Sequence, residues 1–512
     1  MNLDLQVCSR ARLTRDARFD GKFFIAVLST GIYCRPICPS RSSKEINVRY
    51  YPTAAAASEA GFRPCLRCRP ECSPGTPAWL GTPSTVSRAL RLIGESGLED
   101  GGVEVLGERL GVGSRHLRRL FLRHLGATPS AVAQTRRLQF AKKLIDETRL
   151  PMKDVAMAAG FGCVRRFNAA IRKVYHRPPT HLRNLAKQAA VLPENQYLFR
   201  LRYRPPYHWN AMLQFLSEHA APGVEVVEAD RYRRSISLNG EDGYFEVSLC
   251  HETDTLHAQV WFGEPRSLYF ITERIRQMFD LNADWSAIVR SLRGDPFLAR
   301  LLEAKPGLRL AGCWDGFEVA VRAILGSGLA TPEARLVEKF GRAFSPVGGL
   351  THLFPEPEIL VNCDLAAVGV PRAQAQTIRS LARAVCDGEI CFPAMIEASV
   401  FLDRLLKIPG MSEATAQYIA MRTMGDTDAF PVFDADLLRV TGLKNSEELR
   451  QRSECWRPWR AYAAMYLADA GGEAFGENGR VLVPEANTCR NSGSASGQPI
   501  RAQFSSRPVP TW

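Results

Sequence analysis

Apolar residues near the start of the chain alternate over short stretches. Residues 23 to 34 read Phe-Phe-Ile-Ala-Val-Leu-Ser-Thr-Gly-Ile-Tyr-Cys. This pattern predicts two short strands with a turn at Gly31 that delivers Cys34. The alanine-rich residues 54 to 60 predict a helix that ends at Gly61. The beginning of the chain is therefore expected to be a small α/β domain.

Further along, the spacing of apolar residues becomes helical. From residue 86 to 185 it stays helical, with Gly and Pro at short intervals, which predicts a compact all-α domain. Residues 196 to 305 mix the two patterns and predict an antiparallel α+β domain. Its expected strands and helices lie at 197–203, 244–249, 209–219 and 271–279. Residues 306 to 476 return to helical spacing and predict another all-α domain.

Segments rich in Pro, Gly and Ser separate these regions. One lies at residues 72 to 84 and a second break falls at 183 to 195, while the residues after 477 lack periodic apolar positions and predict a disordered tail. At 512 residues the chain is long enough for several cores, so a multidomain protein is expected. The expected divisions are 1–76, 84–186, 196–305, 306–476 and 477–512.

Charge is distributed unevenly along the chain. Residues 1 to 190 contain 32 Lys+Arg and 14 Asp+Glu, whereas the remainder contains 34 and 39, and the whole chain has a net charge of +13. A basic surplus confined to one part favours contact with phosphates over a merely soluble surface. Double-stranded DNA is therefore the expected partner of this part.

Four cysteines form two close pairs in the basic part, Cys34 with Cys38 and Cys65 with Cys68. Two such turns about thirty residues apart supply the four thiolates of a tetrahedral zinc site. Neither an apolar signal segment nor a run of eighteen apolar residues is present, so we expect a cytoplasmic protein with no membrane association. In that compartment paired cysteines bind metal more often than they form disulfides, although the pattern does not separate a structural zinc from a reactive zinc thiolate.

The residues around these cysteines resemble the N-terminal domain of Ada-type methylation-response regulators. The similarity covers residues 15 to 71 and rests on Thr-Gly-Ile-Tyr-Cys-Arg-Pro-Ile-Cys and Gly-Phe-Arg-Pro-Cys-Leu-Arg-Cys. The resemblance implies that Cys34 accepts a methyl group irreversibly from a methylphosphotriester in DNA. It also implies that Cys34, Cys38, Cys65 and Cys68 hold the zinc ion.

Two stretches of the all-α region have helix-turn-helix character. In the first, Gly111 is the expected turn and Ser114 the expected N-cap of a helix that carries arginines. In the second, Gly160 is the expected turn. The side chains expected to reach base edges and phosphates are Arg115, Arg118, Arg119, Arg165, Arg166 and Asn168.

The two stretches together resemble AraC-type DNA-binding domains, and specifically the one that follows the zinc domain in Ada. A helical hairpin alone often has no contact with DNA, but two in tandem on a basic segment favour binding. The resemblance implies a transcriptional activator, with RNA polymerase as a further partner. A nucleoid-associated bacterial protein is expected.

A second chemical signal lies in the last helical region. Pro409, Gly410 and Ser412 join two helices, and the loop amides and the second helix N-terminus of such a hairpin can bind a phosphate. Downstream, Phe-Pro-Val-Phe places Asp434 after a turn. Taken alone, a carboxylate in that position is more often a helix N-cap than a catalytic group.

Residues 196 to about 476 resemble the AlkA-type helix-hairpin-helix DNA glycosylases, which remove 3-methyladenine. The resemblance implies that Asp434 is the catalytic carboxylate, and that Tyr418 and Phe215 line the pocket of a flipped-out base. Ala414 stands where lyases of the superfamily carry lysine, so a monofunctional glycosylase is expected. The sequence departs from the family at Gly328, in the loop expected to wedge into the duplex, and at Ala414 and Ala468, where the family has pocket tryptophans.

Three functions remain open at this stage. The first is a methyl sensor and activator fused to an active DNA-3-methyladenine glycosylase. The second keeps the regulator but leaves a glycosylase-like half that only binds DNA. The third is a transcription factor with a purely structural zinc. No Pro-Cys-His-Arg motif is present, so direct repair of O6-methylguanine is not expected.

Overall fold

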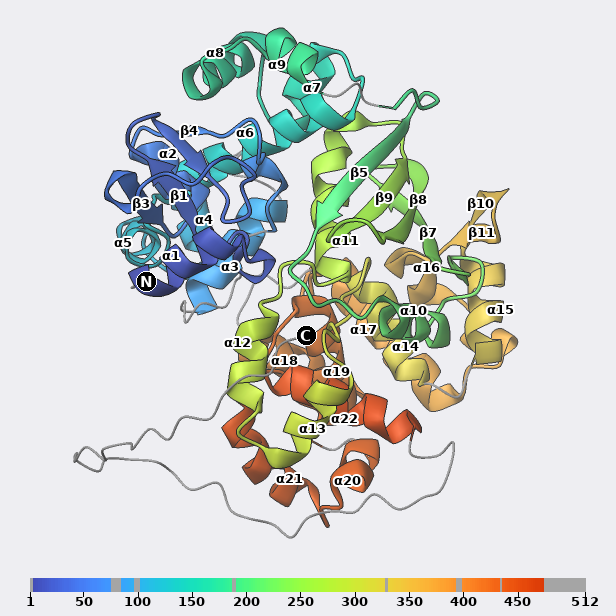
Figure 1. The fold of residues 1–512 in the computed structure, drawn as a ribbon. Coiled ribbons are helices and arrows are strands. Elements are labelled where there is room, and N and C mark those ends of the chain that lie inside the picture. The colour runs from blue at the N-terminus through green and yellow to red at the C-terminus, as the bar shows by residue number, and fades with distance from the viewer. Residues whose placement is uncertain are drawn as a thin grey trace, which may run out of the picture.

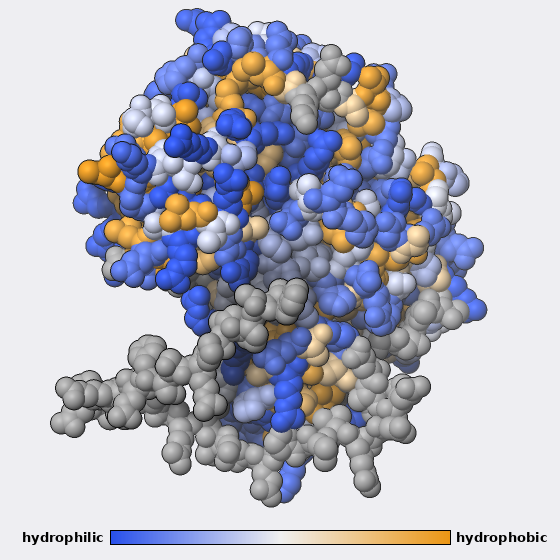
Figure 2. All heavy atoms as spheres, viewed as in Figure 1, coloured by the Kyte–Doolittle hydropathy of each residue, from blue (hydrophilic) through white to orange (hydrophobic). Residues whose placement is uncertain are grey.

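The computed structural model describes residues 3–74, 84–95, 102–186, 190–326, 330–392, 398–432 and 435–473. In Figure 1 the first sheet lies beside α3, α4 and α5 (residues 84–125), and α7, α8 and α9 (residues 152–185) lie above the five-stranded sheet of a larger body that contains many helices. No described helix has the length and apolar character needed to cross a lipid bilayer. Figure 2 shows hydrophilic residues over most of the visible face, with apolar residues in small groups between them.

The first domain is a four-stranded sheet of order β3-β1-β2-β4, in which β2 and β4 are parallel and the other pairs antiparallel. Gly31 has φ +63°, as the expected turn between β1 and β2 requires. Ala54 and Ala57 bury one face of α2 against Phe24, Ala26 and Tyr33 of the sheet. The elements are α1 (Leu5–Thr14), β1 (Phe24–Val27), β2 (Ile32–Cys34), β3 (Val48–Tyr51), α2 (Ala54–Glu59), β4 (Arg63–Pro64) and the 3-10 helices Ala17–Phe19, Glu45–Asn47 and Pro70–Cys72.

The second domain is helical, as expected. Its long central helix α6 begins at Pro129, where Thr128 accepts a hydrogen bond from the Ala131 amide at 3.2 Å and so caps the helix. The shorter helices pack on either side of α6. They are α3 (Ser84–Glu95), α4 (Gly102–Arg109), α5 (Ser114–Leu125), α6 (Pro129–Glu147), α7 (Met152–Ala158), α8 (Val164–Tyr175) and α9 (Pro179–Leu185).

The third region contains a five-stranded antiparallel sheet of order β5-β9-β8-β7-β6. Alternate residues of β5 and β9 are buried, and α11 packs on that face. The α+β expectation is confirmed. The elements are β5 (Gln196–Arg202), α10 (Trp209–Glu218), β6 (Glu225–Glu228), β7 (Arg231–Leu238), β8 (Glu241–Cys250), β9 (Thr255–Trp261), the 3-10 helix Pro265–Ser267, α11 (Leu268–Met278), α12 (Trp285–Leu292) and α13 (Pro296–Ala304).

The fourth region is mostly helical, but the expectation of an all-α domain is wrong. Strands β10 (Arg342–Val347) and β11 (Leu350–Leu353) form an antiparallel hairpin, and the Thr351 and His352 amides donate to the Gly223 carbonyl at 2.8 and 3.0 Å. The helices are α14 (Gly316–Leu325), α15 (Ala330–Phe340), α16 (Pro357–Asn362), α17 (Arg372–Cys386), α18 (Ala398–Leu406), α19 (Glu413–Met424), α20 (Ala435–Thr441), α21 (Ser446–Ser453), α22 (Arg460–Glu473) and the 3-10 helices Leu365–Val368 and Glu454–Trp456.

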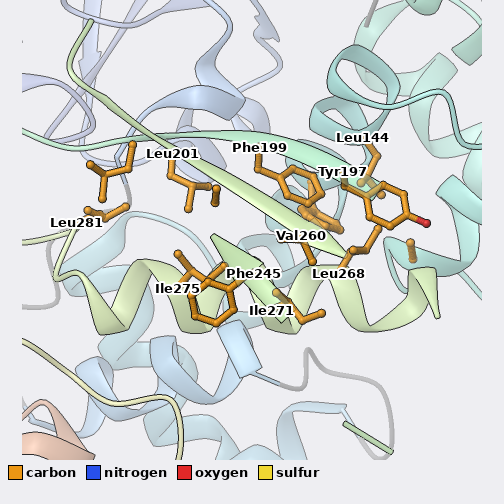
Figure 3. Close-up of a cluster of buried hydrophobic side chains, with 14 of the residues drawn as sticks. Leu144, Tyr197, Phe199, Leu201, Phe245, Val260, Leu268, Ile271, Ile275 and Leu281 are labelled. Atoms are coloured by element: carbon orange, nitrogen blue, oxygen red, sulfur yellow. The ribbon is translucent and has the colours of Figure 1, made fainter. Parts of the chain in front are cut away.

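One apolar core is shared by the helical domain and the five-stranded sheet. Leu144 of α6 is fully buried in the same cluster as Tyr197 and Phe199 of β5, and Ile271 and Ile275 of α11 belong to it as well. Figure 3 shows Leu144 close to Tyr197 in this cluster. The second and third regions therefore pack as one body.

Buried charges join the first domain to α6. Arg69, which directly follows Cys68, lies 2.7 Å from the Asp146 carboxylate, and Lys142 bridges Asp146 at 2.5 Å and Glu71 at 3.5 Å. The side chains of Glu71, Lys142 and Asp146 are almost completely buried. Removing one of these charges would leave its partner buried and uncompensated, so the set fixes the docking of the two domains.

The first domain also contacts the third region directly. Arg204, which is 1% exposed, donates from Nε to the Asp20 carbonyl at 2.8 Å and from Nη1 to the Asn282 carbonyl at 2.7 Å. Nearby, Lys22 lies 2.6 Å from the Asp284 carboxylate. These contacts fix the position of the segment that precedes β1.

Candidate functional site

The four paired cysteines converge at one end of the first sheet. Cys34 ends β2 and Cys65 follows β4, and these two strands run in parallel beside each other, so their carboxyl ends meet. The sulfur atoms of Cys34, Cys38, Cys65 and Cys68 all lie within 4.8 Å of one another. Cys65 and Cys68 are buried, whereas Cys34 and Cys38 are half-buried. Reagents can therefore reach the first pair more easily than the second.

The four thiols fit a tetrahedral metal ion with sulfur ligands. Hydrogen bonds among the thiols raise the pKa of Cys34 and lower the pKa of Cys38, so a bound cation is needed for all four to ionise together. Among the described residues, no other group of three or more Cys, His, Asp or Glu side chains has this arrangement.

Arg35 contacts the cysteine cluster through Cys68. Its backbone N–H donates to Cys68 Sγ at 3.3 Å and its Nη1 donates to the Cys68 carbonyl at 2.9 Å. The guanidinium is 2% exposed and forms a two-point ion pair with Asp20, in which Nε lies 2.8 Å from Oδ1. This pair was missed from the sequence. Its only local signal is the Arg within Cys-Arg-Pro-Ile-Cys, since Asp20 lies on a different segment.

The first helix-turn-helix consists of α4 and α5, joined at Gly111 with φ +70°. Arg115, Arg118 and Arg119 lie on α5 and are exposed, as expected for DNA contacts. Arg118 forms an exposed ion pair with a glutamate of α4 at 3.1 Å. The expected N-cap is wrong, because Ser114 is the first helical residue and the preceding glycine occupies the cap position without a side-chain hydrogen bond.

The second helix-turn-helix consists of α7 and α8, with Gly160 at the turn with φ +74°. Arg165 and Arg166 are exposed on the first turn of α8, and Asn168 is half-buried one turn later. The structure therefore places all six side chains expected to contact DNA on the second helix of each motif.

The helical hairpin formed by α18 and α19 has the expected form. Ser412 caps α19 by accepting a hydrogen bond from the Thr415 amide at 3.0 Å. Gly410 has φ +84°, and a Cβ there would lie 2.2 Å from Thr377 Oγ1. Glycine is therefore required for α18 and α19 to approach α17, and Pro409 precedes it in the loop.

Phe215 of α10 and Tyr418 of α19 both contact a third residue that was missed from the sequence. The Arg422 guanidinium carbon lies 4.7 Å from the Phe215 ring centre and 5.6 Å from the Tyr418 ring centre. Arg422 is four positions after Tyr418, so both project from the same face of α19, which is the signal that could have indicated it. We call Phe215, His219, Tyr418 and Arg422 the aromatic cluster.

Two residues of the regions expected to form the glycosylase site lie outside the described residues. These are Asp434, the expected catalytic carboxylate, and Gly328 in the expected wedge loop. Of the positions where the sequence departs from the family, Ala414 is half-buried at the start of α19 and Ala468 is exposed on α22.

Three family models match the chain. They are the metal binding domain of Ada over residues 7–71, a helix-turn-helix domain over residues 106–185 and the AlkA N-terminal domain over residues 198–315. A protein of Mycobacterium tuberculosis (strain ATCC 25618 / H37Rv) named "Probable bifunctional transcriptional activator/DNA repair enzyme AlkA" is 40% identical over 484 residues, which cover 91% of this chain and 96% of that protein. The chain belongs to this bifunctional AlkA family.

Other relatives match separate parts of the chain. DNA-3-methyladenine glycosylase 2 of Escherichia coli (strain K12) is 30% identical over 279 residues, covering 53% of this chain and 96% of that protein. The bifunctional transcriptional activator/DNA repair enzyme Ada of the same strain is 38% identical over 122 residues, covering 24% of this chain and 33% of that protein. The expected fusion of an Ada-type front with an AlkA-type module is confirmed, and zinc is confirmed as the cofactor by the matched metal binding domain and the four-cysteine cluster.

Proposed function

We propose that this chain is an alkylation-damage response protein that senses methylated DNA phosphates, activates transcription and excises alkylated bases. The observation that carries the proposal is the convergence of four cysteine sulfurs within 4.8 Å on a domain that packs against a helix-turn-helix domain. Damaged and promoter DNA are the proposed binding partners, and RNA polymerase is the proposed target of the activator. A cytoplasmic, nucleoid-associated protein fits these roles.

In the proposed sensor reaction, Cys34 is the methyl acceptor, and Cys34, Cys38, Cys65 and Cys68 are the zinc ligands. Bound zinc keeps the thiolates ionised near neutral pH. The Cys34 sulfur attacks the methyl carbon of a methylphosphotriester, and the methyl–oxygen bond breaks with its electron pair on the phosphate oxygen. The products are a thioether and an ordinary phosphodiester, so each molecule reacts once.

The thioether carries one negative charge less than the thiolate. Repulsion between the sulfur cluster and DNA phosphates then falls, and affinity for DNA rises. The second helices of the two motifs, α5 and α8, are proposed to supply the DNA contacts that become stronger. The two helices would occupy successive segments of the groove. The side chains are Arg115, Arg118 and Arg119 on α5, and Arg165, Arg166 and Asn168 on α8.

In the proposed glycosylase reaction, the loop of Pro409, Gly410 and Ser412 binds a backbone phosphate through its amides. A nucleotide leaves the duplex and its base reaches Phe215 and Tyr418. Asp434 is proposed to stabilise the positive charge that develops on the sugar while water replaces the base. Ala414 leaves no amine at the position where lyases of the superfamily carry the Schiff-base lysine, which supports a monofunctional enzyme.

Two measurements test the proposal. Exposure to DNA containing methylphosphotriesters should add one methyl group to Cys34, and peptide mass spectrometry should locate it there and not on Cys38, which is also half-buried. Purified protein should release 3-methyladenine from methylated DNA, and Asp434→Asn should abolish the release.

A regulator whose second half binds DNA without excising bases is the second candidate. The exposed position of Ala468 and the small side chain of Ala414 favour it, because each missing aromatic ring removes about 1 to 3 kcal/mol of base stacking. Absence of base release, with methyl transfer to Cys34 intact, would support this candidate over the first.

A further inference from the structure

A cavity of about 120 Å³ lies where the first domain, the helical domain and the five-stranded sheet meet. Its walls come from the 3-10 helix Pro70–Cys72, from α6, from β5 and from α11. The 3-10 helix, α6 and β5 also contact one another in pairs. The cavity is therefore shared by three modules of the chain.

Positive side chains outnumber negative ones in the walls of this junction cavity. Five lining side chains are cationic and two are acidic. The cationic residues are Arg136, Lys143, Arg200, Arg202 and Arg276, and the acidic residues are Glu71 and Glu273. The Cys72 thiol adds no negative charge near neutral pH, because burial raises its pKa. The walls thus have an excess of positive charge.

The two acidic side chains do not remove this excess. Glu71 lies 3.3 Å from Arg69 Nε and 3.5 Å from Lys142 Nζ, and neither of these cations lines the cavity. Glu273 lies 4.0 Å from Arg276 Nε, which is long for an ion pair. The negative charge of Glu71 is therefore largely used outside the walls, and that of Glu273 only weakly offsets one arginine.

Three of the five cations have no acidic partner. Lys143 pairs with Glu147 at 2.7 Å. Within the ranges that the structure describes, no ion pair is formed by Arg136, Arg200 or Arg202. Arg136 donates to a backbone carbonyl of α3 at 2.6 Å, which satisfies a donor without neutralising its charge.

Arg202 shows this imbalance most clearly. It is half-buried at the end of β5, and its side chain has no hydrogen bond to any described residue. Burial lowers the pKa of Arg202, and the nearby Arg35 guanidinium lowers it further. Burial also lowers the pKa of Arg276 on α11. A negative charge placed in the cavity would stabilise both guanidinium groups.

The size of the cavity restricts the anion. A water molecule needs about 10 to 15 Å³ of such space, whereas sites for drug-sized ligands enclose about 300 to 1,000 Å³. A cavity of about 120 Å³ therefore has room for an ion of a few heavy atoms and is too small for a nucleotide. Guanidinium groups favour tetrahedral oxyanions, because two of their N–H groups match two oxygen atoms of the ion.

We propose that the junction cavity binds one small tetrahedral oxyanion of the phosphate class, with Arg202 and Arg276 as its principal partners. The bound ion connects the first domain, α6 and β5, and stabilises their docking. None of the four clustered cysteines lines the cavity, so the site is separate from the sensor reaction and does not depend on base excision.

The test is equilibrium binding of inorganic phosphate to the zinc-loaded full chain, at an ionic strength held constant with chloride. The parent chain should bind one phosphate per molecule, and saturation should raise its melting temperature. Arg202→Gln should weaken binding at least about tenfold, since it removes a charge-assisted contact. Glu273→Gln removes a negative charge from the walls and should strengthen binding. It keeps the proposal testable if Arg202→Gln does not fold.

Arg231→Gln is a matched control. It makes the same change of charge on the same sheet, at a side chain that is 56% exposed and does not line the cavity. It should leave phosphate binding unchanged, and adenosine 5′-monophosphate should not displace the phosphate. Equal effects of Arg202→Gln and Arg231→Gln, weaker binding in Glu273→Gln, displacement by the nucleotide, or absence of saturable binding to the parent chain would each overturn the proposal.

Discussion

The buried ion pair between Asp20 and Arg35 should contribute strongly to the stability of the zinc domain. In Asp20→Asn the shape of the side chain is preserved, but the Arg35 guanidinium, which is 2% exposed, loses its counter-charge. Removing one partner of a buried ion pair costs about 3 to 5 kcal/mol of unfolding free energy. The Arg35 guanidinium also donates to the Cys68 carbonyl, and the Arg35 backbone N–H donates to Cys68 Sγ. Displacement of Arg35 should therefore lower the affinity for zinc by about 10- to 100-fold, as for other groups that orient metal ligands.

The chain offers a matched control four residues earlier. Asp16 makes the same two-point contact with Arg18, at 2.9 Å for Nε and 2.6 Å for Nη2, but the Arg18 side chain is 62% exposed. Asp16→Asn should therefore cost about 1 kcal/mol or less, because water screens the exposed pair. Both variants replace Asp with Asn, and the two ion pairs that they break differ mainly in burial.

The assay is urea unfolding of the zinc-loaded full chain, together with zinc transfer to a coloured chelator of known affinity. The expected result is a large loss of stability and faster, more complete zinc transfer for Asp20→Asn, with Asp16→Asn close to the parent protein. Equal effects of the two substitutions would refute the argument from burial. Unchanged zinc transfer in a destabilised Asp20→Asn would show that Arg35 supports the fold without supporting the ligands.

Three further predictions concern the core, pH and DNA. Leu144→Ala should cost about 2 to 5 kcal/mol in thermal or urea unfolding, whereas Leu122→Ala, at a residue that is 51% exposed, should cost about 0.5 kcal/mol or less. Burial raises the pKa of Asp280 from 3.8 to about 6, so its stabilising contribution is fully present below pH 3.8 and is lost as the pH rises through 6. The unfolding free energy of the parent protein relative to Asp280→Asn should therefore fall by about 2.4 kcal/mol between pH 4 and pH 8. Arg165→Gln and Arg166→Gln should each lower the slope of log affinity against log salt by about 1 if these residues neutralise phosphates, and unchanged slopes in fluorescence anisotropy would contradict that role.

The parts of the fold that could be predicted depend on local sequence. The turn at Gly31, the two cysteine pairs and the link between two helices at Pro409, Gly410 and Ser412 each involve residues close together in the chain, and each is present in the structure. The hairpin of β10 and β11 was missed because β10 is largely exposed and contains Pro346, which argues against a strand. Its backbone hydrogen bonds join it to Gly223, which lies on a distant segment of the chain. No local sequence pattern indicates these hydrogen bonds.

The candidate sites show the same division between local and distant information. Cysteine spacing indicates a metal site. It does not indicate that Arg35 contacts this site and forms an ion pair with Asp20. Tyr418 and Phe215 were identified by resemblance alone, and only the structure brings Arg422 against both rings. Charged side chains that pair across long sequence separations leave no periodic signal, since any arginine has many possible partners.

The contacts among the domains have a consequence for how sensing and repair relate. Cys68 is followed by Arg69, whose guanidinium contacts Asp146 of α6, and the same helix places Leu144 in the core that contains β5. From β5 the chain runs directly to Arg204, which donates back to the Asp20 carbonyl beside the Arg35 ion pair. The zinc site is thus held by buried contacts from both the helix-turn-helix domain and the glycosylase module. Because buried charges tolerate little displacement, a change in the sulfur cluster that moved Arg35 or Arg69 would act on both halves together. A flexible tether between regulator and repair enzyme would not transmit such a change, so the packing of this chain favours joint action over simple linkage.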